Sequence, residues 1–178
     1  MITQEENLIL QSYITTSLLA ELGNNQFFSS DYFKSMSFGS PGIKKFLEKN
    51  GVGNQGSAIM SLYAMLVVPY ELIRNNYADE FSEMNAFLAQ KTKNARTNYR
   101  DNVADSDFMY HLRNAVAHCR VSFKEGDSIV FTDSNGAKKE EKKKDFYGEL
   151  PLIDLSAFIH QLQLVVQIKV IKDIQAKR

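Results

Sequence analysis

The sequence predicts a mainly α-helical domain with a small antiparallel β insertion before the last helix. Apolar residues recur at helical spacing over most of the 178 residues. Only 9 glycines and 3 prolines occur, which favours long helices over a turn-rich β fold. After residue 120 the apolar pattern becomes alternating, which is typical of strands. We therefore expect one domain over residues 1–178, with a helical extension at 1–55 and a β-hairpin insertion at 121–150.

The N-terminal 50 residues predict two helices with an irregular segment between them. Residues 4–22 end at a Gly-Asn-Asn stop and are expected to form a helix that covers the core, with apolar residues at Leu10, Tyr13, Ile14, Leu18 and Leu22. Residues 26–39 lack a clear period and predict a loop or a broken helix. Ser40 and Pro41 are a typical cap and first-turn residue for a short helix through Lys49.

Residues 51–56 read Gly-Val-Gly-Asn-Gln-Gly and match the G-x-G-x-x-G pattern of dinucleotide-binding loops. Such loops follow a β-strand and open a βαβ unit. Here a predicted helix precedes the glycines and no parallel βαβ unit follows. We interpret the segment as a connector in which the pair Gly56-Ser57 caps the next helix.

Residues 58–76 form the most apolar segment and predict a central helix, with Ile59, Leu62, Tyr63, Leu66, Tyr70 and Ile73 at helical intervals. Pro69 removes a backbone donor and clashes with the preceding turn, so a kink is expected between Met65 and Tyr70. Glu71 follows the kink. It either faces solvent or points inward toward a cationic partner such as Arg113 or a histidine.

Asp79 is expected to cap a further amphipathic helix, which carries Phe81, Met84, Leu88 and Ala95 on one face. The last turns of this helix are rich in cations, namely Lys91, Lys93, Arg96 and Arg100. They either form a solvated helix end or a track for phosphates. Asp105 or Ser106 is expected to cap the helix that follows.

Residues 107–120 hold two of the three histidines and the single cysteine. On a helical wheel one apolar stripe is formed by Phe108, Leu112, Ala115, Val116 and Cys119. A second face holds His111, Asn114 and His118. Such histidines ordinarily lie in a core with hydrogen-bond partners, and the adjacent Arg113 favours the alternative, a catalytic role.

The segment after residue 120 predicts a β-hairpin and a third strand. Val121 and Phe123, then Ile129 and Phe131, flank a turn that contains glycine, and a third strand is expected before Pro151. The lysine-rich residues 134–145 predict an exposed mobile loop, with a grip on a nucleic-acid backbone as the alternative. Asp154 is expected to cap the last helix, whose apolar face is wide enough for the core and a subunit contact.

Residues 113–118 read Arg-Asn-Ala-Val-Ala-His. This sequence resembles the R-x4-6-H signature of the HEPN superfamily, which lies near the end of the penultimate core helix, often with a polar residue after the arginine. The helical layout over residues 56–176 is similar as well, whereas residues 1–55 show no comparable match. Many HEPN domains are metal-independent endoribonucleases of toxin, abortive-infection and RNA-processing systems. The resemblance therefore implies a HEPN-like helical bundle that acts on RNA.

The residue types suit RNA cleavage without a metal or other cofactor. Histidine titrates near neutral pH and can act as base or acid, while arginine keeps its charge and presents a planar fork to phosphate. Attack by the 2′-hydroxyl would leave a 2′,3′-cyclic phosphate, and DNA would be inert. We assign His118 as general base or acid, Arg113 as phosphate clamp and Asn114 as an orienting hydrogen-bond partner. His111 either assists or is structural.

Arg113 and His118 are five residues apart, which is about 140° around an ideal helix and ~7.5 Å along it. One helix therefore directs them differently. HEPN ribonucleases are known for sites shared by two subunits, so the resemblance implies a homodimer. Some HEPN domains place an acidic residue beside the Arg–His pair, and Glu71 is the candidate here. The candidate RNA contacts are Arg96, Arg100 and Arg120.

Two other classes of function stay open. The first is a noncatalytic HEPN module that binds RNA, nucleotide or a partner protein such as an antitoxin. The second, a metal enzyme using His111, His118 and Asp107, is disfavoured because this spacing is not a usual ligand pattern.

The composition limits where the chain acts and what it binds. The formal charge is zero, with 21 basic and 21 acidic residues, so any RNA contact must come from a local patch. A single cysteine, an N-terminus unlike a signal peptide and no apolar run near ~20 residues predict a cytoplasmic protein without a membrane segment.

Overall fold

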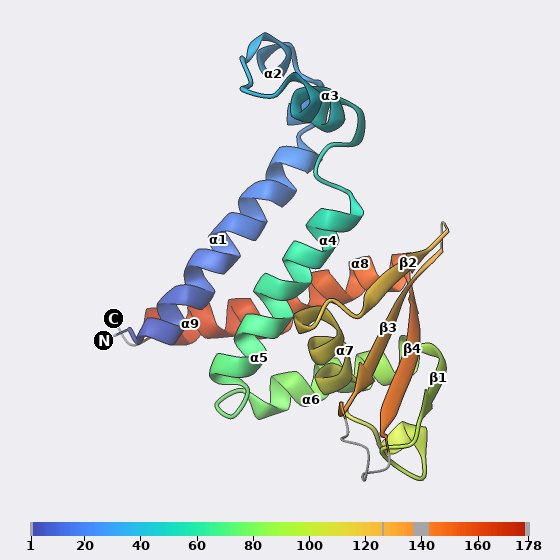
Figure 1. Cartoon of the computed structure of the whole chain (residues 1–178). Coiled ribbons are helices and arrows are strands. Elements are labelled where there is room, and N and C mark those ends of the chain that lie inside the picture. The colour runs from blue at the N-terminus through green and yellow to red at the C-terminus, as the bar shows by residue number, and fades with distance from the viewer. Residues whose placement is uncertain (1, 126, 137–142, 177–178) are drawn as a thin grey trace.

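The computed structural model describes residues 2–125, 127–136 and 143–176. They form a helical bundle beside a four-stranded antiparallel sheet (Figure 1). The α-helices are α1 (Gln4–Asn24), α2 (Asp31–Ser35), α3 (Pro41–Asn50), α4 (Gln55–Leu62), α5 (Val68–Ile73), α6 (Ala78–Lys91), α7 (Phe108–Ala117), α8 (Leu152–Gln161) and α9 (Ile168–Ala176). Short 3-10 and π segments are η1 (Phe27–Ser29), η2 (Tyr63–Val67), η3 (Val103–Asp105) and η4 (Leu162–Gln167). The strands are β1 (Lys93–Thr97), β2 (Val121–Lys124), β3 (Ser128–Ser134) and β4 (Asp145–Pro151).

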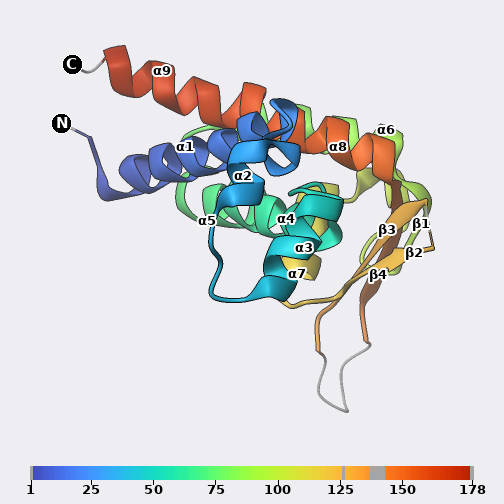
Figure 2. The ribbon, with the colours of Figure 1, turned by 90° about the horizontal axis from the view of Figure 1, so that it is seen from above.

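One continuous helical run, α8–η4–α9, passes behind the bundle and ends beside the start of α1, so the two termini lie at the same end of the molecule (Figure 2). α1 and α4 lead away from the body to α2 and α3 (Figure 1). The sheet lies at the other side, and α7 occupies the space between it and the α4–η2–α5 run. The predicted helical class is confirmed, and the sheet is larger than the predicted insertion.

The α4–η2–α5 run is the predicted central helix, and its apolar residues Leu62, Leu66 and Ile73 are buried in the core. The π-helical segment η2 precedes Pro69, where the sequence predicts a kink, because a wider turn accommodates a residue that has no N–H to donate. By length (19 residues) and mean hydropathy (1.5), Gln55–Ile73 could also cross a membrane. The expectation that no apolar run is long enough to span a membrane was therefore wrong. Buried core helices also reach this length and mean hydropathy.

α1 does not carry its predicted stripe into the core. Its buried residues are Glu6 and Ile9, whereas Ile14 and Leu18 are 57% and 56% exposed. The reason is that α1 leaves the bundle after its contacts with α9, η2 and η4 and continues toward η1 and α2 (Figure 1). The irregular segment 26–39 is confirmed as a broken helix, formed by η1 and α2.

α3 begins as predicted, with Ser40 as its N-cap residue and Pro41 in its first turn, whereas four other helix starts differ from the predicted caps by a few residues. Asn54 caps α4 in place of the pair at 56–57, and Asp107 caps α7 in place of the residues at 105–106. In both cases the side-chain oxygen accepts a hydrogen bond from the backbone N–H three residues later. Two further predicted caps lie inside the first turns of their helices, Asp79 in α6 and Asp154 in α8.

The strand order is β1-β4-β3-β2, and all neighbouring strands are antiparallel. The hairpin and third strand predicted after residue 120 are confirmed as β2, β3 and β4. β1 was predicted as the end of a helix, because lysine, alanine and arginine favour helices. Pairing with β4, in which Arg96 lies opposite Tyr147, overrides that preference. The lysine-rich segment lies in large part outside the described residues, which omit 137–142.

One face of the sheet packs against α7 and is largely apolar. It carries Ile129, Phe131 and Asp133 of β3, and opposite them Leu150, Gly148 and Phe146 of β4. A Cβ atom at Gly148 would lie 2.7 Å from Cζ of Phe131, so this position requires glycine. Asp133 therefore presents a carboxylate to the motif helix from an otherwise apolar surface.

Candidate functional site

α7 places the motif between the central helix and the sheet. Most of its predicted apolar stripe is confirmed as buried, namely Phe108, Leu112, Ala115 and Val116. Cys119 is exposed instead, because the helix ends at Ala117 and Cys119 adopts a φ of 53°. The chain turns out of the helix at this point and enters β2.

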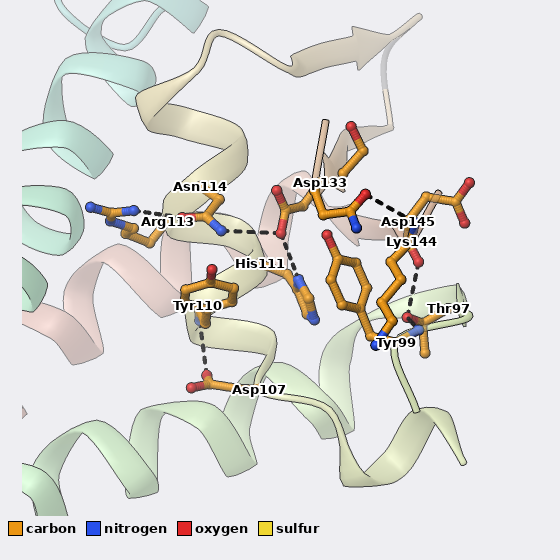
Figure 3. A network of polar contacts seen from close by, with 12 residues as sticks. Thr97, Tyr99, Asp107, Tyr110, His111, Arg113, Asn114, Asp133, Lys144 and Asp145 are labelled. Atoms are coloured by element: carbon orange, nitrogen blue, oxygen red, sulfur yellow. Dashed lines mark hydrogen bonds and ion pairs between the residues drawn. The ribbon is translucent and has the colours of Figure 1, made fainter. Parts of the chain in front are cut away.

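A buried carboxylate, that of Asp133, lies at the centre of the polar network behind the motif (Figure 3). Its Oδ2 lies 2.9 Å from Nδ1 of His111 and accepts a hydrogen bond from Nδ2 of Asn114 at 3.1 Å. The His111 ring also stacks on Phe146, with centroids 4.3 Å apart. Only 5% of the His111 side chain is exposed. Of the two roles open for His111, the structure supports the structural one.

The surroundings of Asp133 keep its carboxylate ionised. Burial by itself raises the pKa of Asp133, but hydrogen bonds from His111 and Asn114 and the nearby charge of Arg120 outweigh burial and hold the pKa below its usual value. The charged Oδ2 of Asp133 accepts a hydrogen bond from the amide nitrogen of Asn114, and this fixes the orientation of the amide group. The amide oxygen of Asn114 is thereby directed away from the sheet, toward Arg113 (Figure 3).

Arg113 is held from two sides. Its Nη1 donates to Oδ1 of Asn114 at 2.5 Å, and its Nη2 forms an ion pair with Glu71 of α5. Glu71 therefore points toward Arg113, which is one of the two orientations that the sequence left open. Its side chain is nevertheless 51% exposed. The Arg113 side chain is 20% exposed, so its guanidinium reaches the surface in a defined orientation.

His118 occupies the position just after the last helical turn. Its side chain is exposed and makes no polar contact with any residue that the structure describes. The expectation that Asn114 and His118 share a helical face was wrong, because the helix ends before His118 and Asn114 is buried. The contact between them is the backbone hydrogen bond from the His118 N–H to the Asn114 carbonyl, 3.0 Å. Asn114 orients Arg113 instead.

The arginines predicted as RNA contacts lie in different places. Arg120 follows the motif, is exposed, and donates to the carbonyl of Ser134 at 3.0 Å. Arg96 lies on β1 with its guanidinium 4.5 Å from the centroid of the Tyr147 ring, and the exposed Arg100 follows that strand. β1 and β2 are the two edges of the sheet, so Arg96 and Arg120 do not form one patch.

The groups considered as metal ligands are apart from one another. His111 is engaged with Asp133, and His118 lies at the far end of α7. Asp107 accepts hydrogen bonds from the Tyr110 N–H and the Tyr70 hydroxyl. Within residues 2–125, 127–136 and 143–176, no three His, Cys, Asp or Glu side chains cluster as a metal site would need.

The glycine-rich segment 51–56 connects α3 to α4, as the sequence predicts, and no strand precedes it. It lines a cavity of about 790 Å³ bounded by α1, the α3–α4 connection and α8. The setting differs from that of a dinucleotide-binding loop, which joins a strand to a helix.

A model of a known protein family matches nearly the whole chain. The family model described as HEPN pEK499 p136 matches residues 1–173. The match includes the N-terminal 55 residues, so the family pattern extends further than the motif and helical layout indicated. The chain matches no curated protein and no solved structure. HEPN domains are often nuclease-like, and they often dimerise and bind RNA. The chain belongs to the HEPN superfamily, in the family described as HEPN pEK499 p136.

Proposed function

We propose that the chain is a metal-independent endoribonuclease of toxin or defence type that acts as a homodimer. The observation that carries the proposal is the contrast between Arg113 and His118 at the end of α7. Arg113 is held by Asn114 and Glu71, whereas the exposed His118 side chain has no polar partner in the described part of the chain. A phosphate clamp must be preorganised, and an acid–base group must be free to meet the substrate.

Arg113 keeps donors for a phosphate after its two protein contacts. An arginine has five N–H groups, and Asn114 and Glu71 engage one each. The Nε–H is buried without a partner among the described residues. The remaining N–H groups at Nη1 and Nη2 lie in one plane and match two phosphate oxygens. Because the guanidinium is already oriented, little reorganisation is needed when substrate arrives.

His118 supplies proton transfer in this mechanism. Acting as base, it takes the proton of the 2′-hydroxyl, the 2′-oxygen attacks the adjacent phosphorus, and the bond from phosphorus to the 5′-oxygen breaks. A protonated histidine, supplied by a second copy of the motif, gives its proton to the departing 5′-oxygen. Arg113 stabilises the charge on the phosphorane oxygens. The products are a 2′,3′-cyclic phosphate and a 5′-hydroxyl.

Exposed apolar side chains next to the motif support the dimer. Met60 and Tyr63 are 68% and 51% exposed and belong to the same helical run as Glu71. The η2 segment that contains Tyr63 packs against α7. The final helix was expected to provide the contact. Its main apolar stripe is buried in its own chain, but Leu164, which widens that stripe, is 43% exposed, and Ile168 and Ile171 are half-buried. We favour the surface beside the motif, because a contact there also brings the two copies of the motif together.

The test compares RNA with DNA of the same sequence, both end-labelled and incubated with the protein in a metal chelator. We expect cleavage of the RNA alone, with a 2′,3′-cyclic phosphate at the new 3′ end of the upstream fragment. An RNA with a single 2′-deoxy nucleotide at the main cleavage position should resist cleavage there. Equal cleavage of DNA, or cleavage that stops in chelator, would contradict the mechanism.

The alternative function is a noncatalytic module that binds RNA, nucleotide or a partner protein. The ion pair between Arg113 and Glu71 favours it, since Glu71 already neutralises part of the charge that a phosphate would meet. Binding of labelled RNA by the parent protein without any cleavage, in the same assay, would support this alternative.

A further inference from the structure

A second cavity lies near the N-terminal end of α7, the end that carries Asp107 in Figure 3. It has a volume of about 420 Å³ and is bounded by α5, the turn into α6, α6 itself and residues 105–109. Sites for small molecules fall in this range of volume. Ser106 lines the cavity, is 3% exposed, and its hydroxyl has no hydrogen-bond partner among the described residues. A buried hydroxyl without a partner is costly, so this group indicates a ligand.

A flat cationic surface forms part of the cavity wall. The exposed guanidinium of Arg74 lies 4.9 Å from the centroid of the Tyr70 ring and donates to the Tyr70 hydroxyl at 2.8 Å. Burial and the charge of Asp107 raise the pKa of Tyr70 to about 12, so its hydroxyl stays protonated and donates to Asp107. These contacts fix the plane of Arg74. Arginine planes and aromatic rings are the surfaces on which unstacked nucleobases lie.

The cavity also offers unpaired donors and an unpaired acceptor. Asn85 accepts the Met109 N–H through Oδ1 at 3.1 Å, which fixes the orientation of its amide. The Nδ2 group of Asn85 donates to no described residue and joins the Ser106 hydroxyl as a donor. Asp105 lines the same cavity, and its carboxylate makes no polar contact in the described part of the chain. A ligand that fits must therefore present adjacent N–H groups to a carboxylate and an oxygen to the donors.

We propose that this cavity is a base subsite that selects guanine, an inference that rests on the proposed action on RNA. Guanine carries adjacent N1–H and N2–H donors, which a carboxylate such as that of Asp105 accepts, and an O6 acceptor for Asn85 or Ser106. Adenine and cytosine place a ring-nitrogen lone pair beside their amino group. Uracil has a carbonyl on each side of its N–H. Each of these bases would bring a lone pair against the carboxylate, which disfavours it.

The cavity is placed to hold a nucleotide close to the scissile phosphate. Asp107, the N-cap residue of α7, and Arg113 within α7 are six residues apart, about 9 Å along the helix axis. On the other side, Arg74 and Glu71 lie one turn apart at the end of the central helix, and Glu71 binds Arg113. A single RNA strand covers this separation within a few nucleotides, so a base in the cavity would set which phosphate lies at Arg113.

The direct test measures binding separately from cleavage. The four ribonucleoside monophosphates are titrated by calorimetry into the parent protein and into His118→Ala, Asp105→Asn and Asp101→Asn. We expect the guanine nucleotide to bind roughly tenfold or more tightly than the other three, as a bidentate base contact allows. Asp105→Asn should abolish this preference. Asp101→Asn, an exposed carboxylate that does not line the cavity, should keep it. Equal binding of the four nucleotides by the parent would overturn the inference, as would a preference that Asp105→Asn leaves unchanged.

Mapping of cleavage positions separates this inference from the proposed function. If the parent cuts RNA at positions next to guanine and Asp105→Asn cuts at other positions, both stand. Cleavage by the parent without any guanine preference would overturn the subsite and leave the nuclease. Guanine-selective nucleotide binding by a protein that cuts no RNA would overturn the nuclease and leave the subsite.

Discussion

Nδ1 of His111 on the motif helix lies 2.9 Å from Oδ2 of Asp133 on β3, 22 residues later in the chain. Both side chains are buried, and Asn114 donates to the same carboxylate oxygen. Asn114 in turn holds Arg113 (Figure 3). The orientation of the proposed phosphate clamp therefore depends on a carboxylate of the sheet that takes no part in the proposed chemistry itself.

Asp133→Ala should lower the free energy of unfolding by roughly 1–3 kcal/mol, because it leaves the buried polar groups of His111 and Asn114 without their acceptor. The measurement is urea denaturation at pH 7. Asp101→Ala is the matched control, since Asp101 is exposed and its side chain makes no hydrogen bond or ion pair in the described part of the chain. An unfolding free energy for Asp133→Ala equal to that of the control would show that the network does not stabilise the fold.

The stability contributed by Asp133 should depend on pH with a defined sign. The pKa of Asp133 is lowered in the folded protein, so its contribution is fully present above the unfolded value of about 3.9 and is lost as the pH falls through the folded value. Asp133→Asn lacks this ionisation. The difference in unfolding free energy between the parent and Asp133→Asn should therefore shrink below about pH 4. A difference that grows on acidification would contradict the assigned shift.

Glu71→Gln should separate binding from catalysis. The Glu71 side chain is half exposed, so the loss of its ion pair with Arg113 should change the unfolding free energy by less than about 1 kcal/mol. Removal of the negative charge should strengthen RNA binding and lower KM. The catalytic rate constant should fall, because the neutral amide of glutamine holds Arg113 less strongly than the carboxylate does. Glu83→Gln on α6, an exposed carboxylate without a described partner, should change neither constant.

Arg113→Lys keeps the positive charge but removes the planar fork. It should slow RNA cleavage by roughly tenfold or more, since an ammonium group cannot contact Asn114 and two phosphate oxygens in one plane. Combined with His118→Ala, the loss should be smaller than the product of the two single effects if the residues act as one unit. Fully multiplicative losses in single-turnover rates would indicate independent roles.

The motif helix and the three strands after it could be predicted because each has a clear period in the sequence. β1 could not, because lysine, alanine and arginine favour a helix and the pairing of Arg96 with Tyr147 depends on a strand about 50 residues later. The prediction that the apolar stripe of α1 covers the core was wrong for a related reason. Ile14 and Leu18 repeat at helical spacing, but the helix leaves the bundle before it can bury them.

Arg113, Asn114 and His118 could be identified from the sequence, whereas Asp133 could not be connected to them. One signal was available. Asp133 has the same strand parity as Ile129 and Phe131, so it points to the apolar face of the sheet and requires a buried partner. Which helix supplies that partner depends on how α7 packs on β3, and strand periodicity carries no such information.

The most direct measurement of the central claim is the initial rate of RNA cleavage in chelator by His118→Ala and His160→Ala, each compared with the parent. His160 is the matched control, since it lies exposed on α8 and its side chain makes no hydrogen bond or ion pair in the described part of the chain. Both variants should keep the circular dichroism spectrum and melting temperature of the parent, because exposed side chains contribute little to stability. We predict that His160→Ala cuts RNA at the parental rate and that His118→Ala is slower by at least about 100-fold, the contribution of a general acid or base. Cleavage by His118→Ala at the parental rate would contradict the account.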